Sequence, residues 1–157
     1  MKDYTEEELE SLISCGKQIV ESPKKEMLID RGHSRNGMKL KSIDGSHDFE
    51  VYIRINEDFE ENFSIGLAYF PKDERGDIHL LRCNGPHGPH KEIENHHNFY
   101  HVHIANPENI RNGLKPERSA YITREYASYQ EALIYFVKRC NIKEAGKYFP
   151  LTYSWTY

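Results

Sequence analysis

The sequence predicts an α+β fold in which an N-terminal and a C-terminal helix pack on an antiparallel β-sheet meander. Two observations carry this prediction: short β-type segments follow one another between residues 27 and 83, and short polar turns separate them. Such turns favour antiparallel neighbours, and we expect about five or six strands. A helix start signal stands on either side of this region. The 157 residues suit one domain spanning 1–157.

The N-terminal helix is predicted by a capping box, in which Thr5 is followed three residues later by Glu8. Apolar or small residues then recur at helical spacing, and Ser22-Pro23 is expected to end the helix. These residues are Leu9, Leu12, Ile13, Gly16 and Val20. We interpret them as a stripe that packs on the core.

The strands are predicted from alternation of apolar and polar residues. Residues 37–43 and 49–55 both alternate, and Asp44-Gly45-Ser46 between them is a hairpin turn signal because Asp-Gly tolerates positive φ. Further strands are expected at residues 27–32, 63–70 and 78–83.

Basic residues gather between positions 24 and 41. They are Lys24, Lys25, Arg31, Arg35, Lys39 and Lys41. A solvated strand face explains them best, and a phosphate-binding role is the alternative. Under that alternative, Arg31 and also Arg54 become candidate substrate-binding residues.

The C-terminal part is predicted to hold a loop, a short strand and a helix. Asn106-Pro107 is expected to break the preceding strand, residues 106–119 to form a loop, and 120–123 to add a short strand. Ser128 with Glu131 then starts the second helix. Its apolar stripe comprises Tyr129, Ala132, Leu133, Phe136, Val137 and Cys140. The aromatic end, residues 148–157, is expected to add a strand or to support a homodimer.

Composition narrows the class of protein. Apolar residues make up 38% and charged residues 29%, as in a soluble globular domain. The net charge of −4 gives no overall positive field for nucleic acid, so RNA binding needs a local basic patch. Three widely spaced cysteines indicate neither a disulfide framework nor a thiolate zinc site. With an acidic N-terminus and no apolar run long enough for a membrane, we expect a cytoplasmic protein.

Histidines concentrate in one stretch. Seven of the nine lie between positions 79 and 103. They are His79, His87, His90, His96, His97, His101 and His103. The stretch is interpreted as a strand, a long loop with two Gly-Pro-His units, and a second strand that carries His-x-His.

Strand geometry predicts how these side chains point. Residues two apart in a strand face the same side, roughly 6.5–7 Å apart, so His101 and His103 share one face. Tyr100, Val102 and Ile104 form the apolar face, which leaves the two histidines on an open or cleft-lining surface. On the preceding strand we expect Leu81 and Cys83 to face the core and Arg82 to lie beside the histidines, because this choice avoids a buried unpaired charge.

The loop over residues 84–98 is predicted to carry function, since it is about three times the median connection length. Gly85 and Gly88 allow close backbone approach, and their N–H groups are candidates for an anion-binding nest. Pro86 and Pro89 stiffen the loop. It would present His87 as a catalytic residue and His90 as a substrate-binding one.

The histidines and the arginine support three interpretations. Two imidazoles can act as general base and general acid, and Arg82 can stabilise negative charge on a phosphate, which is what metal-free RNA cleavage requires. Alternatively, His87, His101 and His103 form an open zinc site. The third interpretation is a polar, histidine-rich surface that has no function or binds a protein partner, as in a non-catalytic component of a bacterial or phage module. We take the first, with no cofactor.

The pattern from Arg82 through His87 to His101-Val102-His103, followed by the helix containing Ala132-Leu133-Ile134-Tyr135-Phe136, resembles a group of small bacterial proteins. These are similar to TumE-type toxins of toxin–antitoxin modules and to uncharacterised families of like size. The resemblance covers roughly residues 77–142 and implies a small α+β fold, a toxin activity on RNA and a cognate antitoxin. It carries over Arg82, His87, His101 and His103. The related pattern usually has an Asp shortly after the arginine, where this chain has Cys83-Asn84.

Overall fold

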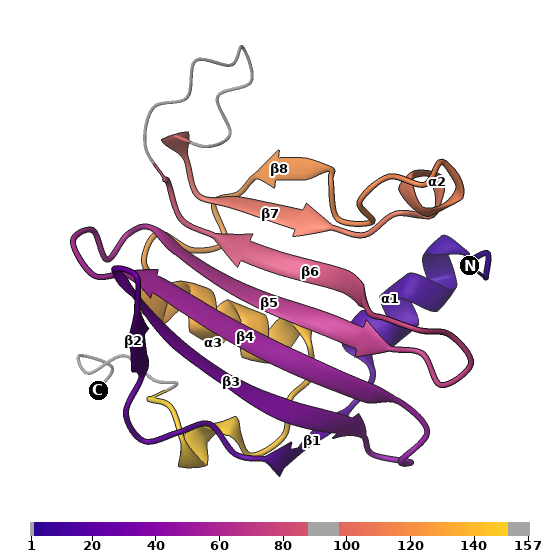
Figure 1. The fold of residues 1–157 in the computed structure, drawn as a ribbon, viewed down its shortest axis with the longest axis horizontal. Coiled ribbons are helices and arrows are strands. Elements are labelled where there is room, and N and C mark those ends of the chain that lie inside the picture. The colour runs from indigo at the N-terminus through magenta and orange to yellow at the C-terminus, as the bar shows by residue number, and fades with distance from the viewer. Residues whose placement is uncertain (1, 88–97, 151–157) are drawn as a thin grey trace.

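The computed structural model describes residues 2–87 and 98–150. Within them, eight strands form one sheet in the order β1-β3-β4-β5-β6-β7-β8, with β2 paired to β3, and every named pair is antiparallel (Figure 1). The strands are β1 (Lys17–Glu21), β2 (Leu28–Asp30), β3 (His33–Ser42), β4 (Asp48–Asn56), β5 (Phe63–Phe70), β6 (Ile78–Asn84), β7 (His101–Ile104) and β8 (Ala120–Ile122). The predicted antiparallel α+β class is confirmed, with more strands than the five or six expected.

The two predicted helices lie on one face of this sheet. They are α1 (Glu6–Ser14) and α3 (Tyr129–Arg139), both behind the sheet in Figure 1. A short α2 (Pro107–Arg111) sits beyond the end of β7, and a 3-10 turn, η2 (Ala145–Lys147), follows α3. Of the described helices, none covers the near face in Figure 1, so that face of the sheet is the open one.

The N-terminal helix is shorter than its apolar spacing predicts. The Thr5–Glu8 capping box is present, but α1 ends at Ser14 and the chain continues as β1 on β3. Val20, expected on the helix stripe, is instead 51% exposed on this edge strand. The β-branched pair Ile19-Val20 favours a strand once β3 offers a ladder of backbone partners.

Residues 106–119 are not a plain loop. Asn106 caps α2 by accepting a hydrogen bond from the N–H of Asn109 at 2.8 Å, and Pro107 occupies the first turn. An Asn-Pro pair can therefore start a helix as well as end a strand, because proline lacks only an N–H that the first turn leaves unpaired.

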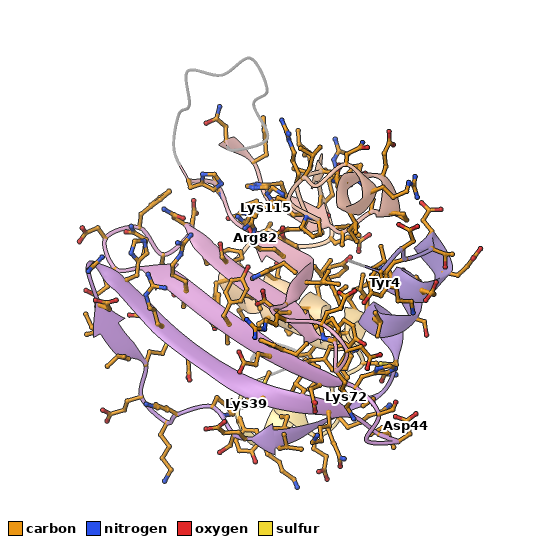
Figure 2. All side chains as sticks on the ribbon, turned by 45° about the vertical axis from the view of Figure 1, so that its right-hand side comes forward. Tyr4, Lys39, Asp44, Lys72, Arg82 and Lys115 are labelled. Atoms are coloured by element: carbon orange, nitrogen blue, oxygen red, sulfur yellow. The ribbon has the colours of Figure 1, made fainter. Side chains whose placement is uncertain are left out.

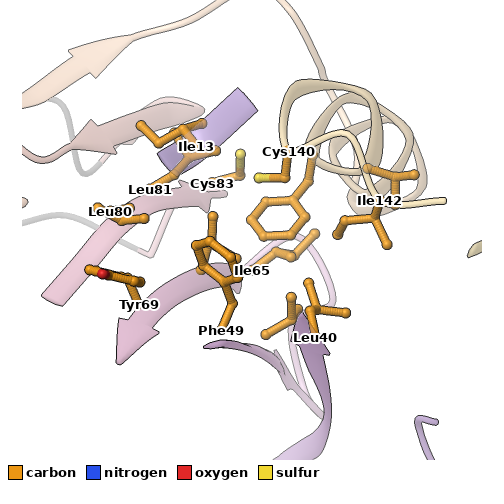
Figure 3. Packing of buried hydrophobic residues seen from close by; sticks show 14 of the residues in the cluster. Ile13, Leu40, Phe49, Ile65, Tyr69, Leu80, Leu81, Cys83, Cys140 and Ile142 are labelled. Atoms are coloured by element: carbon orange, nitrogen blue, oxygen red, sulfur yellow. The ribbon is translucent and has the colours of Figure 1, made fainter. Parts of the chain in front are cut away.

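Alternation along the central strands builds the core between sheet and helices (Figure 3). Phe49, Val51 and Ile53 of β4 are buried, as their spacing predicts. Leu81 and Cys83 also face the core, which confirms the predicted register. Ile78 and Leu80 are buried as well, because the ladder shifts by one residue between Leu67 and Ala68 of β5.

One charged side chain is sealed on the helix side of the sheet. Lys17 is fully buried, and its Nζ donates to the backbone oxygens of Ile13 at 2.6 Å, Cys15 at 2.9 Å and Cys140 at 2.8 Å. It therefore joins the C-terminal ends of α1 and α3. Burial lowers the pKa of this amine.

Across the ranges 2–87 and 98–150, the helices are too short or too polar to cross a membrane.

Candidate active site on the open face of the sheet

Strand pairing arranges polar side chains in two adjacent rows on the open face. The first row runs across five strands through Arg35, Arg54, Ser64, Asn84 and His101. The second row runs parallel to it through Gly37, Tyr52, Gly66, Arg82 and His103. Neighbouring strands lie about 4.8 Å apart, so each row brings residues distant in sequence close together.

His101 and His103 share this face, as their spacing predicts, but they are not exposed. Their exposed fractions are 0% and 6%, so of the expected open or cleft-lining surface the open one is wrong. Nδ1 of His101 lies 2.8 Å from the Phe99 carbonyl oxygen, and Nδ1 of His103 lies 2.9 Å from that of Glu117. A carbonyl only accepts, so each Nδ1 carries the proton and a neutral ring has its lone pair at Nε2.

The predicted meeting of loop and strand histidines is present. His87 follows β6 and is half-buried, and its Nε2 lies 3.4 Å from Nε2 of His101. The ring centroids of His87 and His101 are 5.1 Å apart, as are those of His101 and His103. The three imidazoles therefore form a continuous series from the end of β6 into the sheet.

Tyr126 holds the strand ends on which this series stands. Its buried hydroxyl lies 3.0 Å from the carbonyl oxygen of Asn84 and 2.8 Å from that of His101. Burial raises the pKa of this hydroxyl well above its ordinary value, so it stays a donor. It bridges the ends of β6 and β7.

Arg82 connects the histidines to a pocket. It pairs across the ladder with His103, its side chain is 20% exposed, and it lines a hollow of about 260 Å³. The described lining residues are Arg35, Asn36, Tyr52, Ile53, Arg54, Ser64 and Arg82, with no acidic side chain among them. Desolvation, followed by the nearby Arg35 charge, lowers the pKa of Arg54. We call this hollow the arginine pocket.

Glu117 is a site residue that the sequence analysis missed. It is 1% exposed, and its Oε2 lies 3.7 Å from Arg82 Nη1 and 3.9 Å from both Lys115 Nζ and His79 Nδ1. Figure 2 labels Arg82 and Lys115 side by side at this point of the open face. Among the described residues neither carboxylate oxygen has a hydrogen-bond partner. Glu117 therefore places a carboxylate beside Arg82.

Tyr52 was also missed, although its place on the polar face of an alternating strand gave a signal. A Cβ on Gly66 would overlap the Tyr52 ring and its hydroxyl, so the ring packs against the bare backbone of β5. Its centroid is 5.7 Å from that of His79. Burial raises the pKa of the Tyr52 hydroxyl, while the nearby Arg82 opposes that shift.

Two other predicted substrate-binding residues lie outside this arrangement. The Gly85 N–H donates to the Phe63 carbonyl at 3.1 Å, and a Cβ there would lie 1.8 Å from the Glu61 carbonyl oxygen. Gly85 is therefore needed for close packing, and its N–H is not part of an anion-binding nest. Arg31 is exposed in the β2–β3 turn and is absent from the described lining of the arginine pocket. Gly88 and His90 lie outside the described residues.

The geometry bears on the zinc interpretation in two ways. Two nitrogens bound to one tetrahedral zinc at about 2.0–2.1 Å lie about 3.3–3.4 Å apart, which the Nε2 separation of 3.4 Å between His87 and His101 matches. The carbonyl that fixes Nδ1 of His101 is also typical of a zinc ligand. No group of three histidine, cysteine or acidic side chains in the described parts of the chain has metal-binding geometry.

Comparison with known proteins gives no match: no family model, no curated protein and no solved structure is similar to this chain.

Proposed function

We propose that the open face binds and cleaves RNA, as a toxin-like, metal-independent endoribonuclease. The observation that supports this most is the position of Arg82, which lines the arginine pocket and is paired with His103 at the end of the imidazole series. A phosphate held by Arg82 would thus lie between cationic binding groups and groups able to exchange protons.

The binding step is supported by the charge of the arginine pocket. Arg35, Arg54 and Arg82 come from three different strands and line one small hollow. Guanidinium groups favour phosphate because their planar donors match two phosphate oxygens at once. The local excess of positive charge supplies what the net charge of −4 does not.

The cleavage step needs a base and an acid. An imidazole takes the proton of the ribose 2′-OH, O2′ bonds to phosphorus, and the bond from phosphorus to O5′ breaks as an imidazolium gives O5′ a proton. Arg82 stabilises the negative charge that builds on the phosphate oxygens. The products are a 2′,3′-cyclic phosphate and a 5′-hydroxyl.

The three histidines differ in burial, and we assign them different roles on this basis. His87 is half-buried and stands at the outer end of the series, so it exchanges protons with solvent or substrate. His101 is fully buried behind it and orients the His87 ring. His103, which pairs with Arg82 across the ladder, is the second ring that exchanges a proton with the substrate.

Induced expression in a bacterial host tests the toxin proposal. Wild type is expected to slow growth and fragment RNA, and His101→Ala to restore both growth and RNA integrity. His33→Ala, at the start of β3, is the matched control and should behave as wild type. Equal growth and intact RNA with wild type and His101→Ala would contradict the proposal. The proposal includes a cognate antitoxin or a second copy of the chain as a partner. Either partner would be found by co-purification with the tagged protein.

Zinc binding is the second candidate, favoured by the 3.4 Å separation of the His87 and His101 Nε2 atoms. Elemental analysis of purified protein distinguishes it. Stoichiometric zinc that is lost in His101→Ala would replace the metal-free scheme. RNA binding without cleavage, unchanged when His87, His101 and His103 are all replaced, would instead indicate a non-catalytic binding protein.

A further inference from the structure

We infer that a second pocket, which adjoins the arginine pocket on the β2 and β3 side, binds the base and sugar of a nucleotide whose phosphate lies against the arginines. This inference rests on the proposed function and deepens it, because it makes the substrate of the open face a nucleotide unit and not phosphate alone. We call the second pocket the nucleoside pocket.

The two pockets share a wall. The nucleoside pocket has a volume of about 410 Å³, and Arg35, Asn36 and Tyr52 line both hollows. A ligand group can therefore extend from one into the other past the Tyr52 ring. The larger hollow is suited to a base and sugar, and the smaller, cationic hollow beside it is suited to a phosphate.

The charges of the two pockets also differ. The nucleoside pocket has two carboxylates, Glu21 and Glu50, among three cations, whereas the described lining of the arginine pocket has none. Lys39 Nζ lies 3.4 Å from Glu21 Oε2 and 4.0 Å from Glu50 Oε1, so its charge is already paired. A second phosphate gains little there, because the carboxylates repel it. A nucleobase edge has both donors and acceptors, and this mixed lining offers partners for both.

Apolar surface in the nucleoside pocket suits the face of a base. Leu28 of β2 lines it and is 60% exposed, although leucine is normally buried. Tyr52 supplies an aromatic ring on the side shared with the arginine pocket. Bases stack on such rings regardless of their sequence, so the pocket fits single-stranded RNA, whose bases are accessible.

The wall that carries these groups is held in place without a ligand. Asn36 Oδ1 accepts from the N–H of Lys24 at 3.0 Å and of Gly37 at 2.9 Å, and its Nδ2 donates to the Lys24 carbonyl at 3.0 Å. These bonds tie the segment before β2 to β3. A preformed pocket costs less ordering entropy on binding.

Calorimetric titration of the full chain tests the inference, with inorganic phosphate and uridine and adenosine monophosphates as the probes. Nucleotides are expected to bind at least about tenfold more tightly than phosphate, because base stacking and apolar contact add to the phosphate contacts. Leu28→Ala should weaken nucleotide binding about fivefold and leave phosphate binding unchanged. Ile29→Ala is the matched control, since Ile29 is equally apolar and exposed and points to the other side of β2.

The outcomes separate this inference from the proposed function. If phosphate binds and nucleotides bind no more tightly, or if Leu28→Ala behaves like Ile29→Ala, the nucleoside pocket is wrong and the arginine pocket stands. If neither phosphate nor nucleotide binds to wild type, the proposed function is overturned and the inference with it.

Discussion

Lys17 and Glu117 are both almost fully buried charges, and the protein surrounds them in opposite ways. Lys17, on the helix side of the sheet, donates to three backbone carbonyls within 2.9 Å. The Glu117 carboxylate, on the open face, has cations at 3.7–3.9 Å and no hydrogen-bond partner within the described residues. A buried charge with all its bonds made stabilises a fold, whereas one left unsatisfied costs stability.

The same contrast extends to the two faces of the sheet. In the described parts of the chain, the buried side-chain atoms without a hydrogen-bond partner belong to His79, Arg82, Asn84 and Glu117. All four residues lie in or beside the rows of the open face. Stability is thus concentrated behind the sheet, and unsatisfied polar groups in front of it. Natural proteins tolerate such groups chiefly where they serve function.

The largest expected effect is on stability and comes from Lys17→Met. The change leaves the carbonyls of Ile13, Cys15 and Cys140 buried without their donor, and we expect a loss of about 4 kcal/mol in the free energy of unfolding. Urea unfolding measures it. Lys147→Met, at an exposed lysine in η2, is the control and should change stability by less than about 0.5 kcal/mol. Equal losses in the free energy of unfolding for the two variants would show that the buried Lys17 does not stabilise the fold.

Glu117→Gln is expected to give the opposite pattern. It keeps the size of the side chain and removes the charge that lies beside Arg82 and His79, so RNA cleavage should fall about 10- to 100-fold. The free energy of unfolding should change by less than about 1 kcal/mol, since no hydrogen bond seen in the described residues is lost. A stability loss as large as that of Lys17→Met, with cleavage intact, would make Glu117 a structural residue.

Tyr126→Phe tests whether the Tyr126 hydroxyl supports the strand ends that carry the histidine site. The ring stays, and the carbonyls of Asn84 and His101 lose the hydroxyl between them, so we expect about 1–2 kcal/mol of destabilisation. Chemical denaturation provides the value, and Tyr148→Phe at a half-exposed ring is the control. No difference between these two variants would show that the hydroxyl does not support the site.

The smallest effect concerns pH and the pairing of α1 with α3. Arg139 Nη1 and Nη2 donate to the Glu10 carboxylate oxygens at 2.8 and 2.6 Å, and this lowers the pKa of the Glu10 carboxyl below 4.5. A lowered folded-state pKa gives stability that is present above pH 4.5 and lost as pH falls through the folded value. Because Glu10 is half-exposed, Glu10→Gln should cost only about 0.5 kcal/mol at pH 7 and less at pH 3. A cost that is equal at both pH values would contradict this.

Strand alternation predicted more of this molecule than any other sequence signal. Together with the cost of burying the Arg82 charge, it placed Leu81 and Cys83 inside, and it put Arg82, His101 and His103 together on the opposite face. It could not predict the burial of the two histidines, because alternation assigns a face and says nothing of what packs over it. The strand β1 was missed because its residues also fit a helical spacing, and pairing with β3 decides between the two.

Glu117 shows a different limit of sequence reasoning. It lies in a segment expected to be a loop, far from Arg82 in sequence, and only the pairing of β7 with β6 and β8 brings the two together. A carboxylate recruited across a sheet leaves no local spacing to recognise. The same holds for the arginine pocket, whose three guanidinium groups come from separate strands.

The most direct test of the proposed activity uses purified protein and an oligonucleotide with a single ribose in a DNA strand. Wild type is expected to cut only after the ribose and to leave a 2′,3′-cyclic phosphate, identified by mass, since the 2′-OH is the nucleophile. Arg82→Gln should cut at least about 100-fold more slowly, whereas Arg124→Gln, at an exposed site, should match wild type. Cleavage at deoxyribose positions, or equal rates for wild type and Arg82→Gln, would contradict the account.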